Sequence, residues 1–398
     1  MSAFIFDAIR TPRGQAKEGG ALNSVKPVDL VGGLLKALPE RAGANPETIE
    51  EVFLGCVTQT GEQGGNIAKT ALLRAGWPEA IPAMAVNRYC ASALDACVTA
   101  ANAVEAGQAE LALGGGVESM SRVAILSDQG PYYADREIAV QTKFVPMGEA
   151  ADYIATLEGV SREEADAYAI QSQQRAARAR DDGRFSSIIP VQTPEGKTVE
   201  HDQAIRGSLT VEKLATLPPI FQELGEKWAD AYFLEAYPQF DAVNHIHHVG
   251  NSPGMVDGAS LVLIGSEAAG KAGGLTPRAR IVASASAAAD SLTALTGGTH
   301  AARKVMERAG LTMDDIDLVE VNEAFAAPTL CFIRDIGASP EQVNVNGGAI
   351  ALGHPMGATG GMLIGMLIDE LERQNLKRGL VAISGAAGVG TAMVIERV

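Results

Sequence analysis

The sequence predicts an α/β protein whose two halves share one plan, with a long segment inserted between them. Apolar runs typical of strands alternate with helical patterns, as in mostly parallel sheets covered by helices. Part of this pattern recurs, because Ala309 lies 267 residues (309 − 42) after Ala42 and both open a similar stretch that ends in an apolar strand. We therefore expect an N-terminal half over residues 1–120 (completed by about 249–270), an inserted loop domain over 121–248 and a C-terminal half over 271–398.

The first half opens on a strand and then alternates with helices. Short apolar runs predict its strands and longer periodic runs its helices: strands over Ala3–Ala8, Val52–Cys56, Ile81–Val86 and Glu110–Leu113, and helices over Asp29–Ala37 and Ile67–Ala75. A further helix, rich in alanine, is expected to begin close to Cys90. Its small side chains would allow protein to surround it on every side.

The second half repeats this order, with strands expected over Ile316–Val321 and Leu380–Ile383. The inserted segment contains a strongly helical run that starts after Ser161. Glu164 stands three residues later, which is the spacing of a capping box. We expect this segment to cover a site or to contact another subunit.

Composition restricts the classes of protein and partner. A chain of 398 residues is too long for one simple core. Its formal net charge of −16 argues against nucleic acid and against an anionic membrane surface as partners. The N-terminus shows no signal pattern, and no apolar run approaches the roughly 18 residues that a membrane span needs. The four cysteines (Cys56, Cys90, Cys97 and Cys331) form no Cys-x-x-Cys pair, so we expect a reduced, cytoplasmic protein.

Cys90 and His354 are the candidate nucleophile and base. A cysteine at a helix start meets unpaired N–H groups and the positive end of the helix dipole, both of which favour the thiolate. The alternative is a buried cysteine that acts as a small hydrophobic residue. The repeat sets His354 against Asn87, so the histidine and Cys90 would lie at the starts of equivalent helices, where the imidazole could take the thiol proton.

Other candidate positions follow strands. Asn322 stands at the end of an expected strand, where it could hold a water or donate to an oxyanion, or simply form a turn. The stretch Ser384–Gly390 is a glycine-rich loop after a strand, a pattern also found in nucleotide sites. His245, His247 and His248 have no second ligand cluster in the sequence, so we predict no metal site.

Five motifs resemble those of the thiolase family, in the family's order and across nearly the whole chain. They are Asn87-Arg-Tyr-Cys-Ala-Ser-Ala-Leu, Gly115-Gly-Val-Glu-Ser-Met-Ser, Gly250-Asn-Ser, Asn322-Glu-Ala-Phe-Ala and Gly347-Gly-Ala-Ile-Ala-Leu-Gly-His-Pro-Met-Gly-Ala-Thr-Gly. The resemblance implies the thiolase fold, with two repeated α/β halves in five layers plus an inserted loop domain. It also implies reversible acyl transfer between coenzyme A and a 3-oxoacyl-CoA, without a permanently bound cofactor or metal, in a homodimer or homotetramer.

The same resemblance implies roles for individual residues. Cys90 would be the acylated nucleophile and His354 its base. Asn322 would fix a water that forms one oxyanion hole with His354, and the backbone N–H groups of Cys90 and Ala386 would form a second. Contacts to the acyl group and coenzyme A would come from the following residues: Met147, Gly250, Asn251, Ser252 and Phe325.

Three positions depart from the family pattern. Ser384 stands where the family has its second catalytic cysteine, and a hydroxyl is a far weaker acid than a thiol. Pro146 replaces a histidine of the biosynthetic members, which favours a degradative enzyme, and Pro253 replaces a frequent serine. We predict a degradative thiolase, in which Ser384 is either an altered residue or a sign of slowed or redirected carbon–carbon chemistry. The alternatives are a Claisen-condensing synthase of the same superfamily and a catalytically weakened coenzyme A-binding protein.

Overall fold

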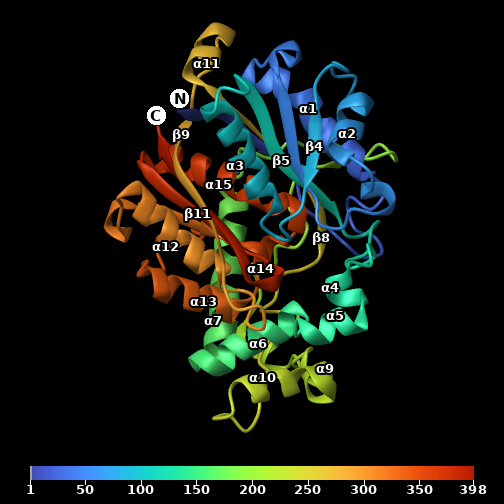
Figure 1. The fold of residues 1–398 in the computed structure, drawn as a ribbon, viewed down its shortest axis with the longest axis vertical. Helices are drawn as coiled ribbons and strands as arrows, with labels where there is room; N and C mark the ends of the chain where they lie inside the picture. The colour runs from blue at the N-terminus through green and yellow to red at the C-terminus, as the bar shows by residue number, and fades with distance from the viewer. Residues whose placement is uncertain (1) are drawn as a thin grey trace.

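One ten-stranded hydrogen-bonded sheet runs through both halves of the protein (Figure 1). The computed structural model describes residues 2–398. The strands of the sheet follow the order β4–β3–β5–β8–β1–β9–β12–β11–β10, and the short β2 pairs with β8 beside this path. Their bounds are β1 Ala3–Arg10, β2 Gly14–Gln15, β3 Glu51–Gly55, β4 Ala83–Val86, β5 Leu111–Ser119, β8 Val256–Ser266, β9 Ala279–Ala288, β10 Leu318–Val321, β11 Arg378–Ser384 and β12 Val389–Arg397.

The order of the strands reveals the repeat. In the first half, β3 is parallel to β5, which is antiparallel to β8, and β8 pairs with β1. In the second half, β10 is parallel to β11, which is antiparallel to β12, and β12 pairs with β9. A single bridge between Val319 and Val343 stands where the first half has β4. The halves join where Phe4 and Ile5 of β1 pair with Arg280 and Ala279 of β9.

Helices cover both outer faces of the sheet and fill the space between its halves. In Figure 1, α1 and α2 lie outside the first half, α12 and α13 lie outside the second, and α3 and α15 lie between them. The bounds are α1 Pro27–Ala42, α2 Ile67–Ala75, α3 Ser92–Glu105, α11 Glu267–Gly273, α12 Gly297–Ala309, α13 Ala326–Ile336, α14 Ala349–Leu352 and α15 Thr359–Gln374. The layers are therefore helices, sheet, central helices, sheet and helices, so the predicted α/β architecture is confirmed.

The alanine-rich helix α3 can occupy the central layer because its side chains are small. Ala96, Cys97 and Ala100 are fully buried in one cluster with Ile364 and Leu367 of α15. Aliphatic side chains of both half-sheets complete the same cluster, so α3 and α15 share one apolar core with both halves. None of the helices within residues 2–398 combines the length and apolarity that crossing a bilayer requires.

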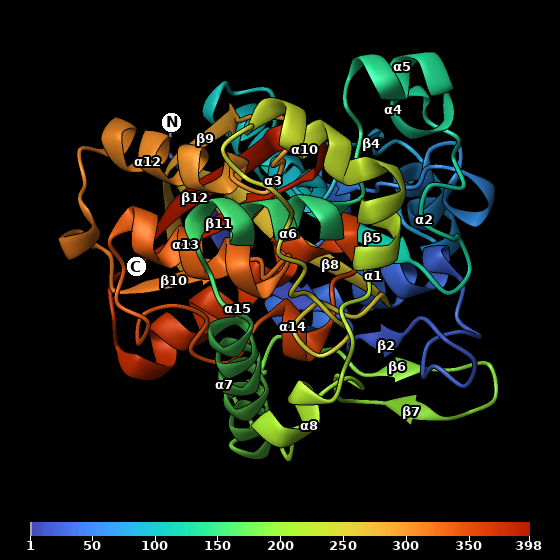
Figure 2. The same ribbon diagram turned by 90° about the horizontal axis from the view of Figure 1, so that it is seen from below.

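The segment between β5 and β8 forms a mainly helical layer at one end of the sheet. Figure 2 looks at this end and shows α6 and α10 in front of the strands. The elements are α4 Pro131–Ala134, α5 Arg136–Gln141, α6 Met147–Glu158, α7 Arg162–Asp181, β6 Val191–Gln192, β7 Thr198–Val199, α8 Val211–Ala215, α9 Gln222–Leu224 and α10 Asp230–Ala236. As expected, Ser161 and Glu164 form a capping box at the start of α7.

Candidate active site

Cys90 lies in a tight turn between β4 and α3. The side chain of Asn87 accepts a hydrogen bond from the Tyr89 N–H at 2.8 Å, and Tyr89 adopts a left-handed backbone with φ of 49°. The hydroxyl of Ser92 accepts from the Arg88 N–H at 2.8 Å and donates to the Tyr89 carbonyl at 2.6 Å. Residues other than glycine rarely adopt a positive φ, because it is sterically unfavourable for them. The hydrogen bonds of Asn87 and Ser92 therefore stabilise the turn that contains Cys90.

The helix begins at Ser92, two residues after the cysteine, so the prediction that it starts close to Cys90 is confirmed. The expectation of a thiolate at Cys90 is wrong. Burial, together with the nearby Glu118 carboxylate, raises the pKa of the Cys90 thiol to about 12. Both effects disfavour a negative sulfur, and they outweigh the helix dipole, which falls off within the first turn. The resting residue is a neutral thiol, so a base has to take its proton as the sulfur attacks.

His354 is held in the tautomer that such a base needs. Its backbone N–H donates to the Gly254 carbonyl at 3.0 Å. The Thr359 hydroxyl donates to the Pro355 carbonyl at 3.2 Å, so its oxygen accepts from Nδ1–H of His354 at 2.8 Å. This assignment follows from the hydrogen-bond network and leaves the lone pair on Nε2.

The electrostatic surroundings keep the imidazole of His354 neutral. Burial lowers its pKa to about 3, and the positive charge of Arg13 acts in the same direction. At neutral pH the ring therefore carries no proton on Nε2 and can accept one. A neutral thiol and a neutral imidazole form a pair in which proton transfer accompanies nucleophilic attack.

Asn322 lies beside His354 at the end of β10. Its backbone N–H donates to the Ala382 carbonyl at 3.0 Å, and its side-chain Nδ2 lies 3.4 Å from Nε2 of His354. The Oδ1 atom is buried and has no hydrogen-bond partner among residues 2–398. A buried unpaired oxygen is costly and is typical of a site that receives water or a ligand. The structure thus brings together two of the predicted residues and leaves an acceptor free beside them.

Glu118 joins the loop after β3 to the loop that carries His354, a role that was not predicted from the sequence. This residue of β5 is fully buried, and its carboxylate accepts from the N–H groups of Val57, Thr58 and Gly357 at 3.0, 3.1 and 2.9 Å. Gly357 belongs to the loop that carries His354, so Glu118 fixes that loop against the first half. The sequence does carry one indication of this role, which is a carboxylate within a strand of small and apolar residues. A buried charge is tolerated only when hydrogen bonds or an opposite charge compensate it.

Glycines allow the loop of His354 to approach the loop of Cys90. A Cβ atom on Gly116 would lie 1.9 Å from the Gly357 carbonyl oxygen, and one on Gly55 would lie 2.6 Å from the same oxygen. The position of a Gly55 Cβ is also 2.4 Å from the backbone nitrogen of Ala93 in α3. The starts of α3 and α15 therefore lie close together, separated only by the backbone of glycines. The repeat had predicted that these two equivalent helix starts face each other.

Ser384 is oriented toward the outer layer. Its Oγ accepts a hydrogen bond at 2.8 Å from the N–H of Gly298, in the first turn of α12. Along β11, Ala382 lies in the cluster that contains α12, whereas Ile383 lies in the central cluster with α3. Because side chains alternate along a strand, Ser384 belongs to the α12 face. The hydroxyl caps a helix, and the structure does not bring it to His354.

The loop after Ser384 does reach the nucleophile. A Cβ atom on Gly385 would lie 3.3 Å from the backbone nitrogen of Cys90 and 3.2 Å from Cβ of Tyr89. Ala386 follows directly and opens a short 3₁₀ turn that ends at Gly388. The two backbone segments predicted to supply N–H groups for an oxyanion hole thus lie against each other.

Two of the predicted coenzyme A contacts line a pocket, and a third does not contribute its side chain. Gly250 and Ser252 border a pocket of about 210 Å³ that also has Lys17 and Arg206 in its wall. The Ser252 hydroxyl is buried without a partner in the described residues. Asn251 is different, because Asp166, His248 and Ile246 occupy its side-chain oxygen and nitrogen. Its amide joins α7 to the segment before β8 and is not available to a ligand.

Met147 and Phe325 lie in the apolar part of the interface between the loop domain and the second half of the protein. Met147 begins α6 and is partly buried against the core of the second half. The ring of Phe325 packs edge-on against Phe221 at 5.8 Å and against His247 at 5.4 Å between ring centres. These side chains form an apolar wall between the loop domain and β10.

Comparison with known proteins matches both halves of the chain. The family model described as "Thiolase, N-terminal domain" matches residues 3–233, and "Thiolase, C-terminal domain" matches residues 275–397. A beta-ketoadipyl-CoA thiolase of Pseudomonas aeruginosa is 40% identical over 99% of each chain. A 3-ketoacyl-CoA thiolase of Pseudoalteromonas translucida is 39% identical over 99% of this chain and 98% of its own. The crystal structure of a Bacillus anthracis acetyl-CoA acetyltransferase superimposes with a TM-score of 0.87 and 31% identity, covering 100% of this chain and 99% of that one.

Proposed function

Because this chain belongs to the thiolase family, we propose that it catalyses reversible thiolysis of a 3-oxoacyl-CoA, giving acetyl-CoA and a shortened acyl-CoA. The observation that carries this function is the close approach of the start of α3, just after Cys90, to the loop of His354, beside the unpaired oxygen of Asn322. The relatives named for beta-ketoadipyl-CoA and 3-ketoacyl-CoA support a degradative substrate with a 3-oxo group.

The chemistry divides into two transfers. Nε2 of His354 takes the thiol proton while Sγ of Cys90 attacks the 3-oxo carbon, and the bond between C2 and C3 then breaks. The electron pair of that bond stays on C2, and the proton held by His354 is available to convert this carbanion into acetyl-CoA. The acyl group remains on Cys90 until the thiol of free coenzyme A attacks the thioester and restores the cysteine.

This route uses Asn322 and the backbone around Cys90 to stabilise negative charge. A water held by Oδ1 of Asn322 would donate to one oxyanion, and the N–H groups of Cys90 and Ala386 to the other. Ser384 takes no part in it, since its oxygen caps α12. Lys17 and Arg206 support binding of the phosphates of coenzyme A at the pocket bordered by Ser252.

A substrate panel tests this function. We expect wild-type protein to cleave acetoacetyl-CoA, 3-oxooctanoyl-CoA or 3-oxoadipyl-CoA, and mass spectrometry to find an acetyl adduct on the Cys90 peptide after incubation with acetyl-CoA. Ser384→Ala should retain kcat within about threefold, because its hydroxyl is not at the reacting atoms. Ser384→Cys is the companion variant, since it restores the family residue.

The outcomes distinguish the alternatives. If wild-type protein binds coenzyme A yet gives neither thiolysis nor an adduct, the chain is a weakened coenzyme A-binding protein. Turnover that is found only in Ser384→Cys would identify Ser384 as the residue that limits the chemistry. Condensation of two acyl-CoA molecules without the reverse thiolysis would instead favour a Claisen-condensing synthase.

The exposed edge of the sheet supports a homodimer. Strand β4 ends the sheet, and its Met84 is 45% exposed. An uncovered strand edge pairs readily with another chain. We expect sedimentation velocity to find a species of twice the chain mass, or of four times it if dimers pair, and Met84→Lys to shift the population toward monomer. A monomeric wild-type chain at micromolar concentration would contradict this assembly. A cytoplasmic location stays a prediction from the sequence.

A further inference from the structure

Three carboxylates surround one imidazole in the loop domain, among residues that the reaction does not use. Glu149 and Asp152 lie on α6, Asp230 begins α10, and His245 lies in the segment that leads to β8. His245 Nδ1 is 2.9 Å from an oxygen of Asp152, and Nε2 is 3.1 Å from an oxygen of Asp230. No Lys or Arg within residues 2–398 forms an ion pair with any of the three carboxylates.

Glu149 is the unusual member of this group. It is 0% exposed, and neither of its carboxylate oxygens has a hydrogen-bond partner in the described chain. Its Oε2 lies 3.8 Å from Nδ1 of His245, so the side chain is aimed into the cluster. One oxygen of Asp230, Oδ1, is likewise buried and unpaired. Buried carboxylates normally have partners, so the wholly unpaired carboxylate of Glu149 beside the free Oδ1 of Asp230 is the pattern expected where a cation binds.

The backbone at Gly225 packs directly against these side chains. Residues Gly225–Ala229 form a turn of π-helix, an irregularity common at functional sites. A Cβ atom on Gly225 would lie 2.6 Å from Cε1 of His245, 2.7 Å from Oδ1 of Asp230 and 2.9 Å from Oε2 of Glu149. Three side chains from three segments thus converge on the backbone of Gly225, where any larger residue would displace them.

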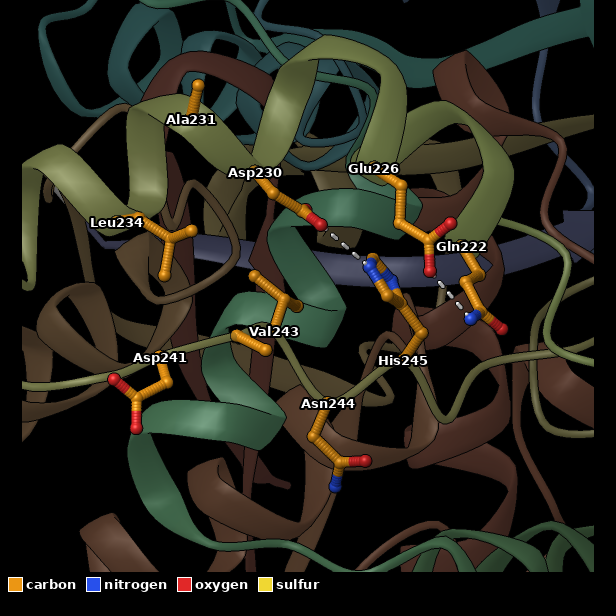
Figure 3. Close-up of a pocket in the computed structure, with 10 residues that line it drawn as sticks. Gln222, Glu226, Asp230, Ala231, Leu234, Asp241, Val243, Asn244 and His245 are labelled. Atoms are coloured by element: carbon orange, nitrogen blue, oxygen red, sulfur yellow. Dashed lines mark hydrogen bonds and ion pairs between the residues drawn. The ribbon is translucent and has the colours of Figure 1, made fainter.

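A pocket connects the cluster with solvent. It has a volume of about 540 Å³, and Asp230 and His245 form part of its wall together with Gln222, Glu226 and Asn244. Figure 3 shows the ring of His245 directed toward Asp230 within this pocket. An ion and a water molecule could therefore reach the cluster without unfolding the domain.

We propose that Glu149, Asp230 and His245 bind a divalent transition-metal ion. Their ligand atoms lie within 4.8 Å of one another. One imidazole nitrogen with two carboxylates is a donor set that suits Zn²⁺, with water from the pocket as the fourth ligand. Ligand atoms about 2.1 Å from a tetrahedral metal are roughly 3.4 Å apart, close to the observed separation of Nε2 and the Asp230 oxygen.

Asp152 would orient the histidine. Its Oδ2 accepts from Nδ1–H of His245, which leaves Nε2, on the side of Asp230, as the metal ligand, and its Oδ1 accepts from Nδ1–H of His247. Glu149, whose Oε2 lies 3.8 Å from Nδ1, would turn toward Nε2 to complete the ligand set. A carboxylate behind a ligating imidazole is the usual second partner of such sites. His248 pairs with Asp166 on α7 and lies outside the cluster. His245, His247 and His248 lie close together in the sequence, but the carboxylates that would complete a metal site with His245 come from distant segments.

The test measures binding of Zn²⁺ and Mn²⁺ to the full-length chain after treatment with a chelator and dialysis. Isothermal titration calorimetry should find one strong Zn²⁺ site per chain, and Glu149→Gln should weaken it by about tenfold or more. Addition of Zn²⁺ should raise the thermal midpoint of the wild-type chain by several degrees and that of Glu149→Gln by clearly less at the same Zn²⁺ concentration. Asp230→Asn serves as a second variant if Glu149→Gln does not fold by circular dichroism.

The matched control is Glu226→Gln. Glu226 borders the same pocket but pairs with Gln222 at 2.8 Å and lies outside the proposed ligand set. It should retain the affinity for Zn²⁺ within about twofold. The proposal is overturned if the wild-type chain binds neither ion, or if wild type and Glu149→Gln bind with equal affinity. In that case the cluster is a proton-bridged network that holds α6 to α10.

Discussion

Replacing Cys90 by alanine should lower kcat for thiolysis by about 10⁴-fold or more, because it removes the atom that carries the acyl group. The change deletes only a sulfur from a partly exposed turn, so the fold should persist. Steady-state cleavage of a 3-oxoacyl-CoA measures the loss. Binding of coenzyme A should change little, since the pocket bordered by Ser252 is separate from the sulfur.

Cys97→Ala provides the matched control. Cys97 lies seven residues farther along, fully buried in α3, where burial strongly raises the pKa of its thiol. Such a residue acts as a small hydrophobic side chain, and its loss should leave kcat within about twofold. If the two alanine variants were equally active, the acyl-enzyme route through Cys90 would be wrong.

Gly116→Ala should destabilise the fold and the catalytic loop together. The new Cβ would lie 1.9 Å from the Gly357 carbonyl oxygen, which is backbone and cannot rotate away. Excess volume in a packed interior costs about 1–3 kcal/mol and sometimes more, and we expect the upper end or beyond here. Thermal unfolding should show a lower midpoint, and kcat should fall because the loop of His354 has to move.

Gly33→Ala is the control for this change. Gly33 lies in α1, and a Cβ there would meet no atom within 4 Å. Alanine is favoured over glycine in a helix by about 1 kcal/mol, so this variant should be slightly more stable than the wild type. Equal stability of the two variants would show that the contact of Gly116 with Gly357 is not tight.

The sequence predicted most of the fold because patterns at two scales agree. The period of apolar residues predicted α2 at its observed bounds, Ile67–Ala75, and the repeat predicted equivalent halves. The start of α3 could be predicted only to within two residues, because neither Cys90 nor Ala91 has a side chain that caps a helix and marks its first residue. The turn there depends on hydrogen bonds of Asn87 and Ser92, which only coordinates show.

The site was harder to predict than the fold. The repeat supported Cys90 and His354 as a pair, since both stand near the starts of two helices that the repeat sets against each other. It could not lead to Glu118 or Thr359, whose roles arise from contacts across the two halves or within a loop. The direction of Ser384 was also hidden, because the side of a strand that a terminal residue faces depends on what packs there.

The position of β1 has a consequence for how the chain folds during synthesis. Both neighbours of this first strand, β8 and β9, are encoded more than 240 residues later. At roughly 5–20 residues per second, β1 leaves the ribosome about 12–50 seconds before either neighbour exists. Throughout that interval its apolar edge is unprotected, so the nascent chain is a natural client for chaperones, and a message cut short before β8 would yield an aggregating product.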